Sequence, residues 1–197
     1  MILHDLFPTP VGCFKLDTDF TTTELDFIKN LETRPNQFNT TSRNSYLFDL
    51  TELSNIYDFC NESLQEYFQS IYSPTHDVSP YITQSWSNYT NNGQSHHSHN
   101  HRNSFISGVL YVQAIKDNDR IYFHKSGYEQ IVVRTDNFNL YNSENWWLGV
   151  ETGQLLLFPS SLVHSVVETA DTRISISFNT FLKGYVGEES TLTGLHL

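Results

Sequence analysis

Histidines are concentrated in one short stretch of this chain, SHHSHNHRNS. Four of the 9 histidines fall between His96 and His101, just before a segment with the composition of a buried strand. Residues two apart on a strand share one face, so His99 and His101 can direct their imidazoles at a single metal ion. A His-x-His pair is weak evidence by itself. The alternative interpretation is a solvated polar loop, of which His96 and His97 would be part.

A second group of candidate residues lies far along the chain, in LLLFPSSLVHSVVETADTRISISF. His164 follows an apolar strand and a Phe-Pro turn, and Arg173 and Ser175 share one face of the strand after it. A guanidinium in such an apolar strand needs a carboxylate or a similar acceptor nearby. The simplest acceptor would be Asp171 or Glu168 at the strand edge.

Two helices and a series of short strands are expected to position these residues. Thr21 and Glu24 form a capping-box pattern, which predicts a helix that begins there. Apolar residues at helical spacing predict a longer helix over 50–72, and the polar residues 33–48 between the helices predict a loop. The alternation of aromatic and β-branched residues then predicts strands in YITQSWSNY, SFISGVLYVQ, RIYFH, QIVVR, WWLGV, GQLLLF, HSVVET and TRISISFNTF.

Composition limits the class of protein. The chain has 197 residues, 14% aromatics and a net charge of −11, so binding to nucleic acid through simple electrostatics is not expected. Cys13 and Cys60 are far apart, which argues against a disulfide scaffold or a cysteine-based zinc site. The N-terminal residues lack the features of a signal peptide, and no apolar run is long enough for a membrane span. We therefore expect a cytoplasmic protein.

Taken together, the motifs resemble those of the Fe(II)- and 2-oxoglutarate-dependent oxygenases. The similarity is strongest to a small subfamily from bacteria and marine phages, and it is carried by LFPTPV, SWSNY, the Gly of NNG, HNHRNSFISGVLYV, GQLLLFPSSLVHSV and RISISFN. The resemblance implies a double-stranded β-helix, or jelly roll, of the cupin-like kind. It implies that His99, His101 and His164 bind the metal, that Arg173 anchors 2-oxoglutarate, and that Ser175 supports it. If the protein is phage-encoded, it would act in the host cytoplasm.

One position departs from the pattern of the wider superfamily. His101 stands where those proteins have Asp or Glu, so three neutral imidazoles would leave more positive charge on the metal. His101 is the first choice as third ligand. The alternatives are a site in which His101 lies behind the metal ligands and water takes its place, or one in which a carboxylate comes from elsewhere, at Asp117, Asp119 or Glu129.

Several other residues are weaker candidates. Tyr111 faces the same side as His99 if the strand is regular, and it would then donate to a 2-oxoglutarate carboxylate, although a core tyrosine is an equally good interpretation. The substrate cleft could be lined by Trp86 and Asn88, and His124 lies on a strand expected to run beside the site. Trp146 and Trp147 would form either a flap or part of the core.

The expected domain organisation is a single domain, with a lead-in and helical support over 1–78, a jelly-roll core over 79–185 and a tail over 186–197. The expected activity is hydroxylation of a C–H bond with decarboxylation of 2-oxoglutarate to succinate. The expected partner is a small-molecule or protein substrate, without nucleic acid or membrane, and the chain could form a homodimer. Two rival functions are a non-catalytic, virion-associated jelly-roll protein with a metal site and a three-His cupin-type dioxygenase that uses no 2-oxoacid.

Overall fold

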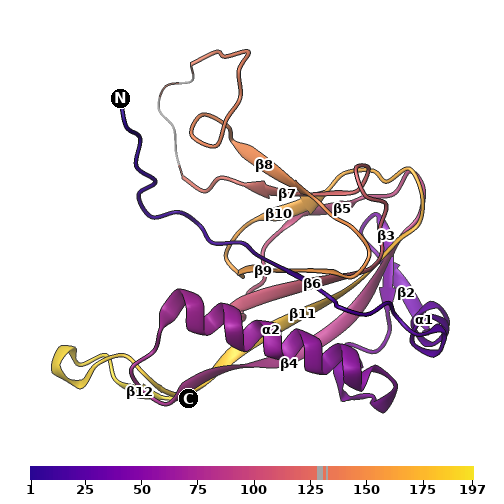
Figure 1. The fold of residues 1–197 in the computed structure, drawn as a ribbon, viewed down its shortest axis with the longest axis horizontal. Helices are drawn as coiled ribbons and strands as arrows, with labels where there is room; N and C mark the ends of the chain where they lie inside the picture. The colour runs from indigo at the N-terminus through magenta and orange to yellow at the C-terminus, as the bar shows by residue number, and fades with distance from the viewer. Residues whose placement is uncertain (128–130, 132) are drawn as a thin grey trace.

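Two antiparallel sheets and one long helix make up most of the molecule (Figure 1). The computed structural model describes residues 1–127, 131 and 133–197. Its helices are α1 (Thr22–Lys29) and α2 (Ser54–Tyr72), with 3₁₀ turns at Leu47–Asp49, Thr51–Leu53 and Glu189–Thr191. Its strands are β1 (Gly12–Lys15), β2 (Thr33–Asn36), β3 (Asn39–Ser42), β4 (Val78–Thr90), β5 (His96–His99), β6 (Ile106–Gln113), β7 (Arg120–His124), β8 (Asn145–Gly149), β9 (Gln154–Pro159), β10 (His164–Val166), β11 (Arg173–Val186) and β12 (Leu195–His196).

The two sheets differ in size and face each other. The larger sheet has the order β1-β9-β6-β11-β4-β3-β2, with β12 paired to β11, and the smaller one has the order β5-β10-β7-β8. Figure 1 shows the smaller sheet stacked over β6, β9 and β11, while α2 runs along the opposite side of the larger sheet. This arrangement confirms the predicted mainly β jelly roll with N-terminal helices.

The face of the larger sheet toward α2 holds the main apolar core. Residues of α2 such as Ile56, Cys60 and Leu64 are buried in one cluster with Ile176 and Phe178 of β11. The side chains of a strand alternate between faces, so every second residue over 174–178 of β11 joins this core. The other face of the same strand is therefore turned toward the smaller sheet.

The sequence-based prediction is wrong between the helices. Residues 33–48, predicted to be a loop, contain the hairpin β2–β3, which extends the larger sheet. Its polar residues are buried because they bond to a neighbouring backbone: Thr41 Oγ1 donates to the carbonyl of Ser87 (2.9 Å), and the Ser87 amide donates to Ser42 Oγ (3.1 Å). Because its buried residues are polar, an alternation of apolar and polar residues cannot predict such a strand. The capping box of Thr21 and Glu24 is confirmed at the start of α1.

Two further boundaries differ from prediction. Helix α2 begins at Ser54 instead of residue 50, because Leu47 and Leu53 are fully buried and the chain reaches them through 3₁₀ turns. The predicted strand QIVVR is not formed by its described residues, where Ile131 and Val133 are each 80% exposed, and its remaining apolar position lies outside the described residues.

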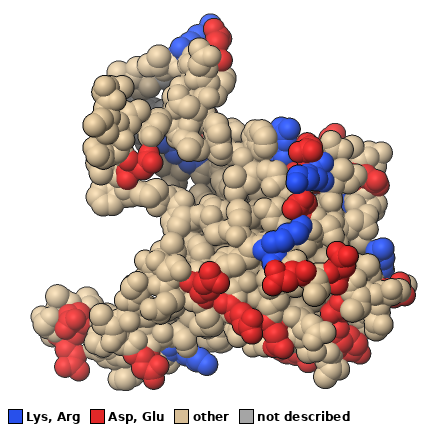
Figure 2. Space-filling model, viewed as in Figure 1, with Lys and Arg blue, Asp and Glu red and all other residues tan. Residues whose placement is uncertain are grey.

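The N-terminal residues run as an extended arm past β9 toward the connection between β7 and β8 (Figure 1). The hydroxyl of Tyr141 in that connection donates to a carboxylate oxygen of Asp5 (2.8 Å). Asp58, Glu62 and Glu66 are exposed along α2, and Figure 2 shows acidic side chains gathered over this lower part of the molecule. Among the described residues, none of the helices is long and apolar enough to span a lipid bilayer.

Candidate functional site

Three histidines from separate parts of the sequence meet between the two sheets. His164, at the start of β10, pairs in register with His99, at the end of β5. His101 lies just beyond β5, where its amide donates to the carbonyl of Ser160 (3.0 Å). The ring centroids are 4.4 Å apart for His99 and His164, 5.0 Å for His99 and His101, and 5.2 Å for His101 and His164. One potential ligand nitrogen from each ring lies within 4.8 Å of the others.

Hydrogen bonds to the backbone orient two of these rings. His99 Nδ1 lies 2.8 Å from the carbonyl oxygen of His97, and His164 Nδ1 lies 3.0 Å from that of Leu162. A carbonyl can only accept, so Nδ1 of each ring carries the proton and donates it. Nε2 is then left with a free lone pair, which is the usual arrangement of metal-binding histidines.

Burial keeps the three imidazoles neutral. It lowers the pKa of His164 to about 3 and that of His101 to about 4, and it also lowers the pKa of His99. The neighbouring imidazoles add to these shifts because a second positive charge nearby is unfavourable. Only a neutral imidazole can bind a metal ion, so this cluster needs no deprotonation at neutral pH before metal binding.

Arg173 and Ser175 line the same space from the start of β11. Arg173 is 4% exposed, and its Nη1 lies 3.3 Å from Oδ1 of Asp119, which is 3% exposed. The same carboxylate accepts hydrogen bonds from Thr169 Oγ1 (2.8 Å) and from the amide of Ile115 (2.8 Å). The acceptor is thus a buried residue 54 positions away in sequence, not the expected Asp171 or Glu168.

One pocket contains these groups. Tyr111 of β6 is 2% exposed, lies opposite Ser175 in the sheet, and also lines the pocket. Asn88 of β4 donates from Nδ2 to Ser177 Oγ (3.0 Å), whereas its buried Oδ1 has no hydrogen-bond partner among the described residues. The described residues that line the pocket are Trp86, Asn88, Thr90, His96, His99, His101, Val109, Tyr111, Ile121, His164, Ser165, Val166, Arg173, Ser175 and Ser177.

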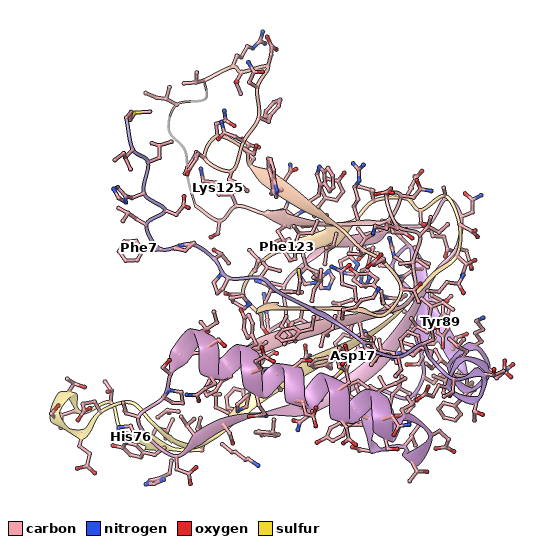
Figure 3. The ribbon with its side chains drawn as sticks, viewed as in Figure 1. Phe7, Asp17, His76, Tyr89, Phe123 and Lys125 are labelled. Atoms are coloured by element: carbon pink, nitrogen blue, oxygen red, sulfur yellow. The ribbon has the colours of Figure 1, made fainter. Side chains whose placement is uncertain are left out.

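Aromatic side chains enclose the histidines. The Trp86 ring stacks on His101 with centroids 5.8 Å apart, and the Phe158 ring lies 4.8 Å from that of His164. Phe123 of β7, labelled in Figure 3, has its centroid 6.4 Å from His164. These contacts remove water from one side of the cluster and hold two of the rings in place.

The other carboxylate candidates are not part of the histidine cluster. Asp119 is occupied by Arg173, Asp117 is exposed, and Glu129 lies outside the described residues. His124 Nε2 is hydrogen-bonded with Ser165 Oγ (2.8 Å), beside the pocket. The remaining aromatic candidates lie on β8: Trp146 and Trp147 are 40% and 42% exposed, and Trp147 packs against the guanidinium of Arg120.

Sequence reasoning underestimated two residues. A polar loop was the alternative interpretation for His96, whose role was left open, and the structure places it on β5, where it lines the pocket. Asp119 was considered only as a metal ligand, and its contact with Arg173 joins residues 54 positions apart, which no local pattern records. The sequence signal for this contact was an acidic residue, Asp119, directly before the predicted strand RIYFH.

The jelly roll encloses a histidine cluster that could hold a metal ion, together with a buried arginine. Residues 84–179 match the family model described as "Putative 2OG-Fe(II) oxygenase". That segment includes all of the histidines and the arginine of the pocket. The segment is therefore similar to the 2OG-Fe(II) oxygenases, a family whose cofactors are iron(II) and 2-oxoglutarate. No curated protein matches the chain in sequence.

Solved structures share the fold. An oxidoreductase of the 2OG-Fe(II) oxygenase family from Burkholderia pseudomallei has a TM-score of 0.57 at 14% identity, covering 86% of this chain and 84% of that one. HygX from Streptomyces hygroscopicus, with nickel, 2-oxoglutarate and hygromycin B bound, gives 0.58 at 12% identity, covering 87% and 82%. A prolyl-4-hydroxylase from Pseudomonas putida gives 0.53 at 14% identity, covering 87% and 92%. At such identities the likeness concerns the fold alone.

Proposed function

We propose that this protein is an Fe(II)- and 2-oxoglutarate-dependent dioxygenase that hydroxylates a C–H bond of a small-molecule or protein substrate. The observation that carries the proposal is the convergence of His99, His101 and His164 with Arg173 in one pocket. The binding of nickel and 2-oxoglutarate by HygX, which has the same fold, supports it.

The residues present fit both cofactors. His99, His101 and His164 would hold Fe(II), since each offers a neutral imidazole and one nitrogen of each ring lies within 4.8 Å of the others. Arg173 and Ser175 would bind the distal carboxylate of 2-oxoglutarate, and Tyr111 and Asn88 would complete its surroundings. When bound, iron and 2-oxoglutarate supply the oxidising chemistry, with release of CO2 and succinate.

The rest of the chemistry belongs to this chain. Arg173 would fix the orientation of the 2-oxoacid through a charge-assisted hydrogen bond, which is strong in a buried setting. Asp119 holds the guanidinium in place through Oδ1, and its other oxygen is fixed by the Ile115 amide. Val109 and Ile121 line the pocket with apolar surface and exclude water from the reacting centre.

The charges of this arrangement balance. Fe(II) and 2-oxoglutarate carry opposite double charges, three neutral imidazoles add none, and Arg173 is matched by Asp119. A carboxylate in place of His101 would add one negative charge, which an unpaired arginine would offset. In this chain the carboxylate, Asp119, lies beside Arg173 and not among the proposed metal ligands, so the net charge of the loaded site would be zero.

The first test is spectroscopic. Anaerobic addition of Fe(II) and then 2-oxoglutarate to the metal-free protein should give a weak visible charge-transfer band, and admission of oxygen should release succinate. A protein that binds Fe(II) without this band on addition of the 2-oxoacid would instead be a 2-oxoacid-independent dioxygenase. A protein that gives the band but no succinate over hours would support a binding role.

A further inference from the structure

A bulge in β5 changes which histidines share a face. His164 pairs with His99, but Val166 pairs with His96, so three steps along β5 match two steps along β10. In a regular strand His96 would point away from His99, because their separation is odd. The extra residue reverses that relation and brings His96 to the side of His99. Bulges of this kind re-aim side chains near functional sites.

The bulge creates a second cluster of imidazoles. The ring centroids lie 4.7 Å apart for His96 and His99, 4.8 Å for His97 and His99, and 5.1 Å for His96 and His97. One potential ligand nitrogen from each ring is within 4.8 Å of the others, the same limit that holds for the first cluster. His99 is common to both.

Two details show that this second cluster has nitrogen atoms available. Nδ1 of His97 is buried and has no hydrogen-bond partner among the described residues. The contact of His96 Nδ1 with Asn39 Nδ2 is long, at 3.4 Å, so little is lost when the ring turns. A buried nitrogen without a partner is costly, and a metal ion would satisfy it.

We propose that His96, His97 and His99 form a second position for a divalent transition metal, in exchange with the position formed by His99, His101 and His164. A set of imidazole nitrogens suits Co(II), Ni(II), Cu(II) and Zn(II). Small side-chain rotations would bring the nitrogens to the roughly 2.0–2.1 Å from the ion that zinc requires. Water would complete the coordination.

The two positions exclude each other. His99 Nδ1 is bonded to the carbonyl of His97, so only Nε2 of this ring can bind an ion. An ion held by His96 and His97 therefore leaves His101 and His164 without the third ligand. Because His164 is buried and the three histidines of β5 are partly exposed, the second position is the more accessible to an incoming ion.

The test separates the positions by ligands that they do not share. Metal-free protein is titrated anaerobically with Co(II), whose visible spectrum reports its ligands, in competition with a chromophoric chelator. His164→Ala should still bind one Co(II), with a spectrum that differs from that of the wild type. Adding His97→Ala should weaken this remaining binding by at least about 100-fold. His97→Ala alone should still bind one Co(II), at the position formed by His99, His101 and His164.

Two outcomes would overturn the second position. One is a His164→Ala protein that is folded by circular dichroism but binds no Co(II). The other is equal Co(II) affinity of His164→Ala and His164→Ala/His97→Ala. If His164→Ala does not fold, His101→Ala with and without His97→Ala gives the same comparison, since His101 lies outside the strands.

A matched control excludes non-specific binding. His76→Ala removes an exposed imidazole near β12, far from the cluster (Figure 3), and should leave the Co(II) affinity of the His164→Ala protein unchanged. The proposed oxygenase function is read separately, from the Fe(II)–2-oxoglutarate band of His97→Ala. Either position can therefore fail without the other.

Discussion

The two faces of β11 have different roles, although their residues alternate along one strand: one face packs in the apolar core and the other lines the pocket. Ile174, Ile176 and Phe178 are buried against α2 in the apolar core. Arg173, Ser175 and Ser177 point the other way and line the pocket. Residues that stabilise the fold and residues that line the pocket are therefore one position apart, because side chains of a strand alternate between faces. Substitutions on one face should therefore change folding, and those on the other should change ligand affinity.

The largest effect is expected on the apolar face. Phe178 is fully buried, packs against Phe48 with centroids 5.7 Å apart, and lies over Gly108, where no side chain would fit. Phe178→Ala should lower the free energy of unfolding by about 3–5 kcal/mol, since it leaves a cavity. Chemical denaturation measures this loss. The adjacent Ser177→Ala on the other face is the control and should cost much less. Equal losses would refute the division between the faces.

The counterpart on the pocket face is Arg173→Ala. The guanidinium is the buried positive charge facing the proposed 2-oxoacid, so its removal should weaken 2-oxoglutarate binding by at least about 100-fold. Fe(II) binding should persist. Titration of the visible band with 2-oxoglutarate gives the affinity, and Arg173→Lys should recover part of it. Wild-type affinity in Arg173→Ala protein would remove Arg173 from the site.

Much of this division could be read from the sequence, because alternation in TRISISF places Arg173 and Ser175 on one face and the isoleucines on the other. The order of His99, His101, His164 and Arg173 also resembled a known pattern. Their spatial convergence was a prediction from that resemblance, and the structure brings the three imidazole rings together. The features that the sequence could not predict depend on the register in which two strands pair. The bulge that turns His96 inward is one extra residue in a register, and only the paired strand β10 defines it.

The pH dependence of stability should report the buried His164 of the pocket. Burial lowers the pKa of His164 to about 3, whereas an unfolded histidine has its usual value near 6.5. Between these values the unfolded state binds a proton that the folded state does not, so the metal-free protein should lose stability as the pH falls below about 6.5.

His164→Gln should make that loss less steep, by up to about 1.4 kcal/mol per pH unit. The free energy of unfolding is measured with a chelator present from pH 7 to pH 4. The exposed His76→Gln variant is the control for the effect of a His-to-Gln change elsewhere on the molecule. An unchanged slope in His164→Gln would mean that the buried imidazole is protonated in the folded state.

The smallest expected change tests where the carboxylate of the site belongs. His101→Asp supplies a metal ligand with a negative charge, so Fe(II) binding should be retained or tightened. The same charge makes the site net negative once 2-oxoglutarate is bound, because Asp119 already neutralises Arg173. Affinity for 2-oxoglutarate should therefore fall, by about tenfold or less. Adding Asp119→Asn removes the second carboxylate and should restore most of this affinity. Asp119→Asn in the wild-type background is the control for damage to the Arg173 position.

Complete loss of Fe(II) from His101→Asp would instead show that the site requires a third imidazole. If the double variant bound 2-oxoglutarate more weakly than either single variant, Asp119 would act by positioning the guanidinium and not by balancing charge.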